Sequence, residues 1–188
     1  KSFQDGLYQI KDISSILAGE YTAPKAGDTI VDVCGAPGGK SINAALKMSE
    51  QGDCGRVIAR DLSDYKVALI DENIKRLNIT NIQTQVYDAL DCDESLINKA
   101  DIVIADLPCS GLGIIGRKPD IKYNALPEKL QSLVDLQRDI LKVVSRYVKS
   151  GGVLMYSTCT INRAENEDNA DWICKESGFT KDGEYHQL

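Results

Sequence analysis

Five short runs of apolar residues recur along the chain, with stretches between them long enough for helices. These runs span residues 29–33, 56–59, 82–86, 101–105 and 153–156. They are rich in β-branched residues and mostly uninterrupted, as strands covered on both faces are. The longest intervening stretch has apolar residues three, four and seven positions apart, at Leu130, Leu133, Val134, Leu141, Val144 and Val148. That spacing predicts a helix with one apolar face. The alternation predicts an α/β fold with a doubly wound, Rossmann-like parallel sheet.

Turn residues suggest where these elements begin and end. Residues 24–28 predict the turn into the first strand, and Gly151-Gly152 predicts the end of the long helix. The 188 residues contain no repeat or linker, so we expect one domain, residues 1–188, with one sizeable core. Because only ten residues follow Gly178, we expect the sheet to lack its closing C-terminal strands.

The chain begins at Lys1 and carries no charged-then-apolar leader, and its apolar runs are too short to span a bilayer. We therefore expect a cytoplasmic fragment of a longer protein, monomeric and without a membrane contact. The six cysteines form no C-x-x-C pair, and only His186 could join them as a ligand, so we expect free thiols and no metal.

The net charge of −6 argues against a domain that grips nucleic acid by bulk electrostatics. Residues 107–150 carry the opposite charge, with eight Lys or Arg against four Asp or Glu and a net charge of +4. The rest of the chain therefore has a net charge of −10. Within this segment, Arg117, Lys118 and Lys122 are candidates for phosphate contacts, with a solvated surface as the alternative.

The loop after the first strand, residues 34–40, reads Cys-Gly-Ala-Pro-Gly-Gly-Lys. A phosphate-binding P-loop needs a glycine five residues before the Gly-Lys pair, where this chain has Cys34, with Gly35 one position off. A dinucleotide fingerprint fails too, because the glycines fall in the wrong order. A methyl-donor pocket remains, in which Asp61, after the second strand, would hold ribose hydroxyls. Asp88 and Asp106 follow the third and fourth strands and extend a row of carboxylates along the same edge.

Two of the cysteines stand where the ligand pocket should lie. Cys109 follows the fourth strand in Asp106-Leu107-Pro108-Cys109, and Cys159 follows the fifth in Tyr156-Ser157-Thr158-Cys159. Cys34, Cys54, Cys92 and Cys174 are more simply interpreted as small buried hydrophobic residues.

A thiol pair beside a methyl-donor pocket suits one reaction in particular. Carbon 5 of cytosine is a poor nucleophile until another nucleophile adds at carbon 6, and a thiolate can provide that addition. After methylation a base must remove the proton from carbon 5 before the thiol can leave. Two thiols would therefore have two tasks.

At this point the chain resembles a known family, the RNA cytosine-5 methyltransferases of the RsmB/Fmu/Sun group, from Phe3 to about Asn166. The matching segments are residues 32–40, Asp61, Asp88-Ala89, residues 106–113, residues 117–120, residues 157–159 and Glu165-Asn166. The resemblance implies a class I methyltransferase fold and S-adenosylmethionine as cofactor.

The resemblance also implies roles for individual residues. The cofactor would be wrapped by Cys34, Gly35, Ala36, Pro37, Gly38, Gly39 and Lys40, with Asp61 at its ribose and Asp88 by its adenine. Asp106 would lie between the methionyl group and the target base. Cys159 would be the nucleophile and Cys109 the residue that assists release. DNA cytosine methyltransferases instead use the cysteine of the proline-cysteine element as nucleophile.

The chain departs from the family pattern at a few positions. Lys11 stands where a glutamine is expected, Gly35 where alanine is usual and Arg163 where proline is frequent. The stretch from Gly111 to Tyr123 looks most like bacterial enzymes that modify small-subunit (16S) ribosomal RNA, in which a helical RNA-binding domain precedes the catalytic one.

Two other functions stay open from the sequence alone. One is a catalytically inactive RNA-binding module on the same fold. The other, more distant, is a P-loop NTPase, which ATP rather than a methyl donor would stabilise.

Overall fold

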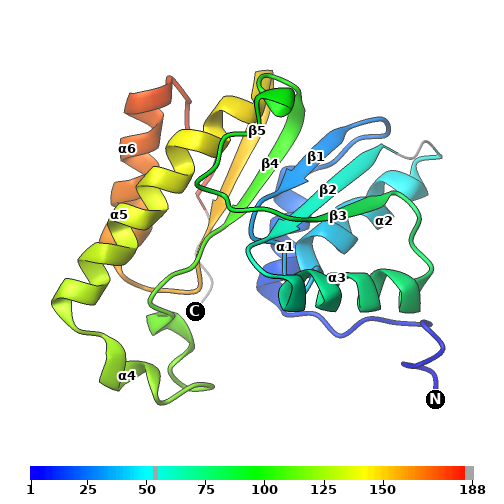
Figure 1. Cartoon of the computed structure of the whole chain (residues 1–188), viewed down its shortest axis with the longest axis horizontal. Helices are drawn as coiled ribbons and strands as arrows, with labels where there is room; N and C mark the ends of the chain where they lie inside the picture. The colour runs from blue at the N-terminus through cyan, green and yellow to red at the C-terminus, as the bar shows by residue number, and fades with distance from the viewer. Residues whose placement is uncertain (53–54, 185–188) are drawn as a thin grey trace.

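A sheet of five parallel strands in the order β3-β2-β1-β4-β5 runs through the protein (Figure 1). The computed structural model describes residues 1–52 and 55–184. Its strands are β1 (Thr29–Asp32), β2 (Arg56–Asp61), β3 (Ile82–Val86), β4 (Ala100–Asp106) and β5 (Val148–Ser157). The predicted strand positions and the doubly wound α/β class are confirmed.

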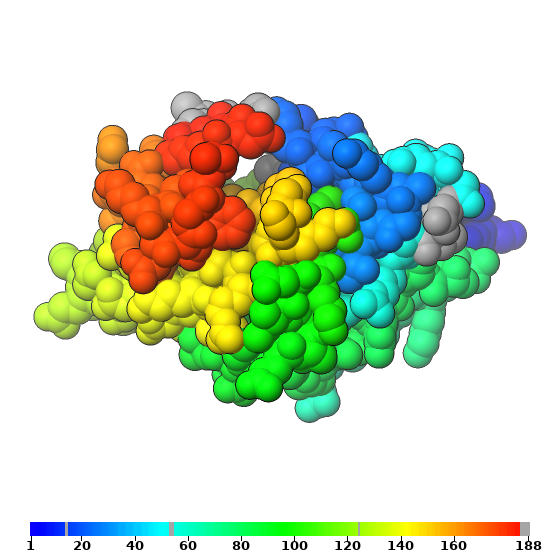
Figure 2. All heavy atoms as spheres, turned by 90° about the horizontal axis from the view of Figure 1, so that it is seen from above, coloured from blue at the N-terminus to red at the C-terminus, as the bar shows by residue number. Residues whose placement is uncertain are grey.

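Helices cover both faces of the sheet. They are α1 (Ile13–Thr22), α2 (Gly39–Glu50), α3 (Asp64–Leu77), the short α4 (Ile121–Asn124), α5 (Pro127–Val144) and α6 (Glu167–Ser177). Short 3-10 turns lie at Glu94–Leu96, Leu112–Ile114, Ser145–Tyr147 and Arg163–Glu165. Seen from above, the part with α5 and α6 lies on one side and the N-terminal part on the other, with the part of the chain that holds β4 and β5 between them (Figure 2).

Alternating residues of the strands supply the two halves of the core. Ile30, Val57 and Ile102 pack with α2, whereas their neighbours Val31 and Val103 pack with α5 and α6. All five side chains are almost fully buried. This two-sided burial explains why the strands read as near-continuous apolar runs.

The strand order reverses between β1 and β4, which are neighbours in the sheet. In open parallel sheets the crevice at the carboxyl ends of such strands is where ligands bind. Here β1, β2 and β4 each end on an aspartate, namely Asp32, Asp61 and Asp106. Asp61 and Asp106 of the predicted row thus end strands at this edge, Asp32 adds a third carboxylate, and Asp88 follows the end of β3.

The predicted end of the long helix is wrong. Helix α5 stops at Val144, and Val148 together with Gly151-Gly152 belongs to β5. Between Ala100 and Ile102 the pairing of β4 with β5 shifts register, and the glycine pair lies within residues 149–152, which stand opposite this shift. Gly151 has φ +75°, so its left-handed backbone serves a strand irregularity instead of a helix cap.

The cysteines that the structure describes are free thiols. Cys34, Cys92 and Cys174 are partly buried, in broad agreement with their predicted packing role. Cys54 and His186 lie outside the described residues. None of the described helices has the length and apolar composition needed to cross a membrane.

Candidate active site

The glycine loop is a tight turn tied to the neighbouring strand. Gly38 is the N-cap of α2 with φ +99°, a conformation that requires glycine. The Gly38 amide donates to the carbonyl of Gly35 (2.6 Å), and the Ala36 amide donates to Oδ2 of Asp61 (3.1 Å). The loop backbone is therefore fixed beside β2 at the N-terminus of a helix, where a ligand can approach closely.

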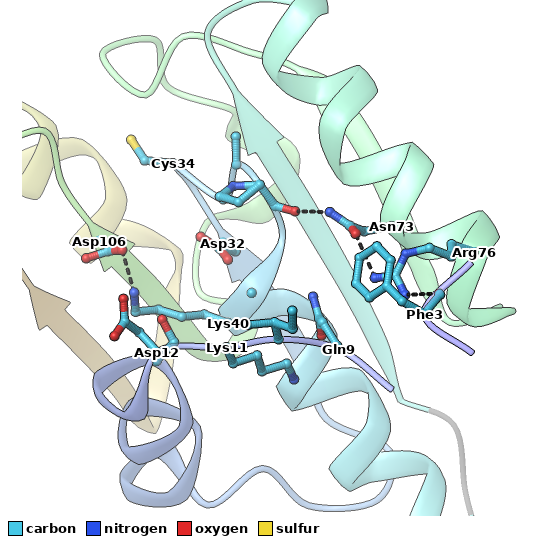
Figure 3. A pocket seen from close by; sticks show the side chains of 16 residues that line it. Phe3, Gln9, Lys11, Asp12, Asp32, Cys34, Lys40, Asn73, Arg76 and Asp106 are labelled. Carbon is cyan, nitrogen blue, oxygen red and sulfur yellow. Dashed lines mark hydrogen bonds and ion pairs between the residues drawn. The ribbon is translucent and has the colours of Figure 1, made fainter. Parts of the chain in front are cut away.

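A cavity of about 350 Å³ separates this loop from the N-terminal segment (Figure 3). Its size falls in the usual range of small-molecule sites. Predicted cofactor residues that line it are Cys34, Gly35, Ala36, Pro37, Gly39, Lys40 and Asp106. Residues that the sequence did not assign to it come from the N-terminal segment and α3, and they are Phe3, Gln9, Ile10, Lys11, Asp12, Ser15, Asn73 and Arg76, together with Asp32 of β1.

The other predicted cofactor residues lie elsewhere. Asp61 is buried behind the loop, where it accepts from Ala36 and forms an ion pair with Lys66 (3.0 Å). Asp88 accepts from the Leu90 amide (2.9 Å) and does not line the cavity. Their roles at ribose and adenine stay predictions.

Asp32 gives the cavity an unusual acidic group. The residue is 1% exposed, its carboxyl accepts from the hydroxyl of Ser41 (2.5 Å), and Oδ1 has no partner among the described residues. Burial raises the pKa of Asp32 to about 7. An orphaned buried oxygen at the wall of a cavity is satisfied when a donor from a ligand enters, and a methyl donor with an amino group supplies one.

Asp106 links the cavity to the thiols. It forms an ion pair with Lys40, whose side chain is only 15% exposed, and Oδ1 accepts from the hydroxyl of Ser157 (2.7 Å). The Asp106 side chain remains 37% exposed, so it can still meet a substrate.

The two cysteines predicted to act together do lie together. Sγ of Cys109 and Sγ of Cys159 are 3.3 Å apart, and the Cys159 amide donates to Sγ of Cys109 (3.3 Å). The hydrogen bond from Cys109 lowers the pKa of Cys159 to about 7, and the same contact raises that of Cys109 well above its ordinary value. Cys159 is the exposed member of the pair. The pair is therefore asymmetric, because Cys159 ionises more readily than Cys109 and is partly thiolate at neutral pH.

A buried carboxylate joins the two loops that carry these thiols. Glu165 is 0% exposed and accepts from the amide and hydroxyl of Ser110 (2.8 and 2.6 Å), from Gln137 (3.1 Å) and from Asn162 (3.0 Å). The hydroxyls of Ser110 and Thr160, each next to a cysteine, are 2.7 Å apart. The relative position of the thiols thus depends on a polar network behind them.

Gly113 adds a second tie between the loops. Its amide donates to the carbonyl of Cys159 (3.1 Å), and a Cβ at this position would lie 2.9 Å from that oxygen. Any larger residue would push the Cys159 loop away from its neighbour.

The sequence did not assign Gln137 or Glu165 a role, although one signal was present. Gln137 interrupts the apolar stripe of α5 between Val134 and Leu141, and it is fully buried. Its amide donates to the carbonyl of Pro108 (2.9 Å) and to Glu165. A polar residue in an apolar helix face indicates a buried partner.

Metal ligation finds no support at this site. Over residues 1–52 and 55–184 no three His, Cys, Asp or Glu side chains come close enough together to hold an ion.

The strand order, together with the residues at the carboxyl ends of the strands, defines a class of protein. The parallel sheet with this order, the glycine loop and the acidic strand ends are those of Rossmann-like, S-adenosylmethionine-dependent methyltransferases of class I, which are also its structural neighbours. The solved structure of NSun6 from Pyrococcus horikoshii with SFG, an analogue of S-adenosylmethionine, superposes with a TM-score of 0.82 at 30% identity over 94% of this chain and 44% of that one.

Sequence comparison narrows the class to a family. The model of the family described as 16S rRNA methyltransferase RsmB/F matches residues 20–180, so the chain belongs to this family. The probable ribosomal RNA small subunit methyltransferase B of Bacillus subtilis is 42% identical over 88% of this chain, and the ribosomal RNA small subunit methyltransferase F of Escherichia coli O157:H7 is 34% identical over 89%. The chain spans 37% and 35% of the lengths of these two relatives.

Proposed function

We propose that residues 1–188 are the catalytic domain of an enzyme that transfers a methyl group to carbon 5 of cytosine in RNA. The observation that carries this proposal is the pair of thiols 3.3 Å apart, flanked by Asp106 and by the cavity under the glycine loop. Methylation of oxygen or exocyclic nitrogen needs no enzyme nucleophile, whereas carbon 5 of a pyrimidine does. Bound S-adenosylmethionine would supply the electrophilic methyl group.

Cys159 acts as the nucleophile. Its exposed sulfur is the one with the lowered pKa, so it is partly thiolate at neutral pH. The thiolate adds to carbon 6 of the ring, the ring electrons shift toward carbon 5, and carbon 5 takes the methyl group.

Cys109 acts in release. Its pKa is raised first by the hydrogen bond with Cys159 and then by burial. Once Cys159 becomes a thioether it is no longer an anion, and the largest cause of that rise disappears. Cys109 can then release its proton to solvent and, as a thiolate, take the proton from carbon 5. The electron pair of that C–H bond re-forms the double bond between carbons 5 and 6, the carbon–sulfur bond breaks, and Cys159 leaves as a thiolate while the methylated base is freed.

Asp106 hydrogen-bonds the ring while charge develops on it. Its carboxylate stands three residues before Cys109, and both of its oxygens are oriented, one by Lys40 and the other by Ser157. A preoriented polar group at the reacting ring lowers the barrier without reorganising during the reaction.

Ribosomal RNA of the small subunit is the proposed substrate. This proposal rests on the family and on the relatives named as small-subunit enzymes. The target cytosine must be unpaired or extruded to reach both thiols. We place the protein in the cytoplasm with its ribosomal substrate.

The direct test is transfer of labelled methyl from S-adenosylmethionine to 16S ribosomal RNA by the full-length protein, followed by digestion to nucleosides. We expect label in 5-methylcytidine and none with Cys159→Ala. Label in another nucleoside would contradict the proposal, as would no label from a folded protein that binds the methyl donor.

A further inference from the structure

Three cationic side chains line the cavity under the glycine loop, and two of them are engaged. Lys40 is paired with Asp106, and Arg76 donates to the carbonyls of Phe3 (3.1 Å) and Tyr8 (3.0 Å). For Lys11, no acidic or hydrogen-bonding partner occurs within the part of the chain that the structure describes. Figure 3 shows its ammonium group turned away from the Lys40–Asp106 pair, on the side of the cavity where Gln9 lies.

Partial burial of the charged Lys11 side chain costs free energy when no anion lies beside it. The side chain is partly buried, and this desolvation lowers its pKa from the ordinary value. A half-buried ammonium gains most from an anion that enters the same cavity.

The cavity also has acceptors that lack partners. Oε1 of Gln9 and Oδ1 of Asp32 are buried and without a partner among the described residues, and both residues line the cavity. A zwitterionic ligand would match these groups, because its carboxylate can pair with the Lys11 cation and its ammonium group can donate to the two acceptors.

The position of the cavity indicates which end of the methyl donor it takes. Asp106, next to the thiols, lines it, whereas Asp61 and Asp88, predicted at ribose and adenine, do not. The amino-acid end of the donor is therefore the part that this cavity accommodates.

We propose that Lys11 binds the α-carboxylate of the methionine moiety of S-adenosylmethionine and selects donors that carry it. This inference rests on the proposed function.

The test compares two ligands by isothermal titration calorimetry: S-adenosylmethionine and its decarboxylated analogue, which lacks only the α-carboxylate. Lys11→Met should weaken the binding of S-adenosylmethionine by about tenfold to a hundredfold, which is the range for loss of a charge-assisted hydrogen bond. Binding of the decarboxylated analogue should stay within about twofold of wild type. Lys11→Arg should recover most of the affinity because it restores the positive charge.

The control is Lys25→Met, because Lys25 is exposed and does not line the cavity. It should leave both affinities unchanged, and thermal melting without ligand should show that each variant is folded. An equal loss for both ligands in Lys11→Met would overturn the inference while leaving the proposed function intact. Unchanged affinity for both, with weaker RNA binding, would place Lys11 at the substrate instead and also overturn it. Failure of the wild type to bind either ligand would instead reject the proposed function, and the inference with it.

Discussion

At the scale of single residues, the asymmetry of the two thiols decides the chemistry. The pKa of Cys159 is lowered to about 7 by the hydrogen bond from Cys109. Because only the thiolate reacts with iodoacetamide, the alkylation rate of Cys159 should rise with pH and reach half its maximum near pH 7. Peptide mass spectrometry after timed alkylation measures this rate site by site.

The matched variant for this measurement is Cys109→Ala. It removes the donor while leaving Cys159 in place, so the midpoint should move up toward the ordinary thiol range, about 8.5. A midpoint near pH 7 in the variant, or one near 9 in the wild type, would show that Cys109 does not activate Cys159.

At the scale of elements, Glu165 connects α5, the loop after β4 and the loop after β5. Glu165→Ala leaves several buried donors unsatisfied, so we expect it to lower the free energy of unfolding by about 3 kcal/mol or more. Glu165→Gln keeps the shape and part of the hydrogen bonding and should cost less. Urea unfolding measures both, and the alkylation midpoint of Cys159 should rise in each variant because the thiols separate.

The control for Glu165 is Glu50→Ala at the exposed end of α2, which should change stability by no more than about 0.5 kcal/mol. A Glu165→Ala protein as stable as this control, with an unchanged Cys159 midpoint, would mean that the buried network does not position the thiols.

The elements also show what periodicity can and cannot predict. The strands were predictable because two-sided burial leaves a local mark, an apolar run, in the sequence. The end of α5 was not, since a glycine pair suits a helix cap and a β-bulge equally, and the pairing of β5 with β4 decided between them.

Some residues of the candidate site could likewise be predicted from the sequence, and others could not. Cys109 and Cys159 were predictable because each follows a strand, and parallel strands bring their carboxyl ends to one edge. The N-terminal wall of the cavity was not, because Gln9 and Lys11 reach it through tertiary packing that no local pattern records.

At the scale of the whole molecule, charge limits how this chain meets RNA. The net charge is −6, and residues 107–150 are the basic exception. Among their candidate phosphate contacts, Arg117 is already paired with Asp12 (2.6 Å). We therefore expect residues 1–188 to bind 16S ribosomal RNA weakly, with a log–log salt slope of about −2 or shallower.

Filter binding across a salt series measures that slope, and Lys118→Ala should make it shallower by up to about one. Tight, sequence-selective binding by these 188 residues alone would refute the expectation that RNA affinity is largely supplied by another part of the protein.

The central claim is the division of labour between Cys159 and Cys109, and a covalent adduct tests it most directly. The full-length protein is incubated with S-adenosylmethionine and substrate RNA, then denatured and separated by electrophoresis. Cys109→Ala permits attack and methyl transfer but blocks release, so a denaturation-resistant protein–RNA band should accumulate. Cys159→Ala lacks the nucleophile and should give neither band nor product. A band with Cys159→Ala that is absent with Cys109→Ala would reverse the two roles and contradict the account.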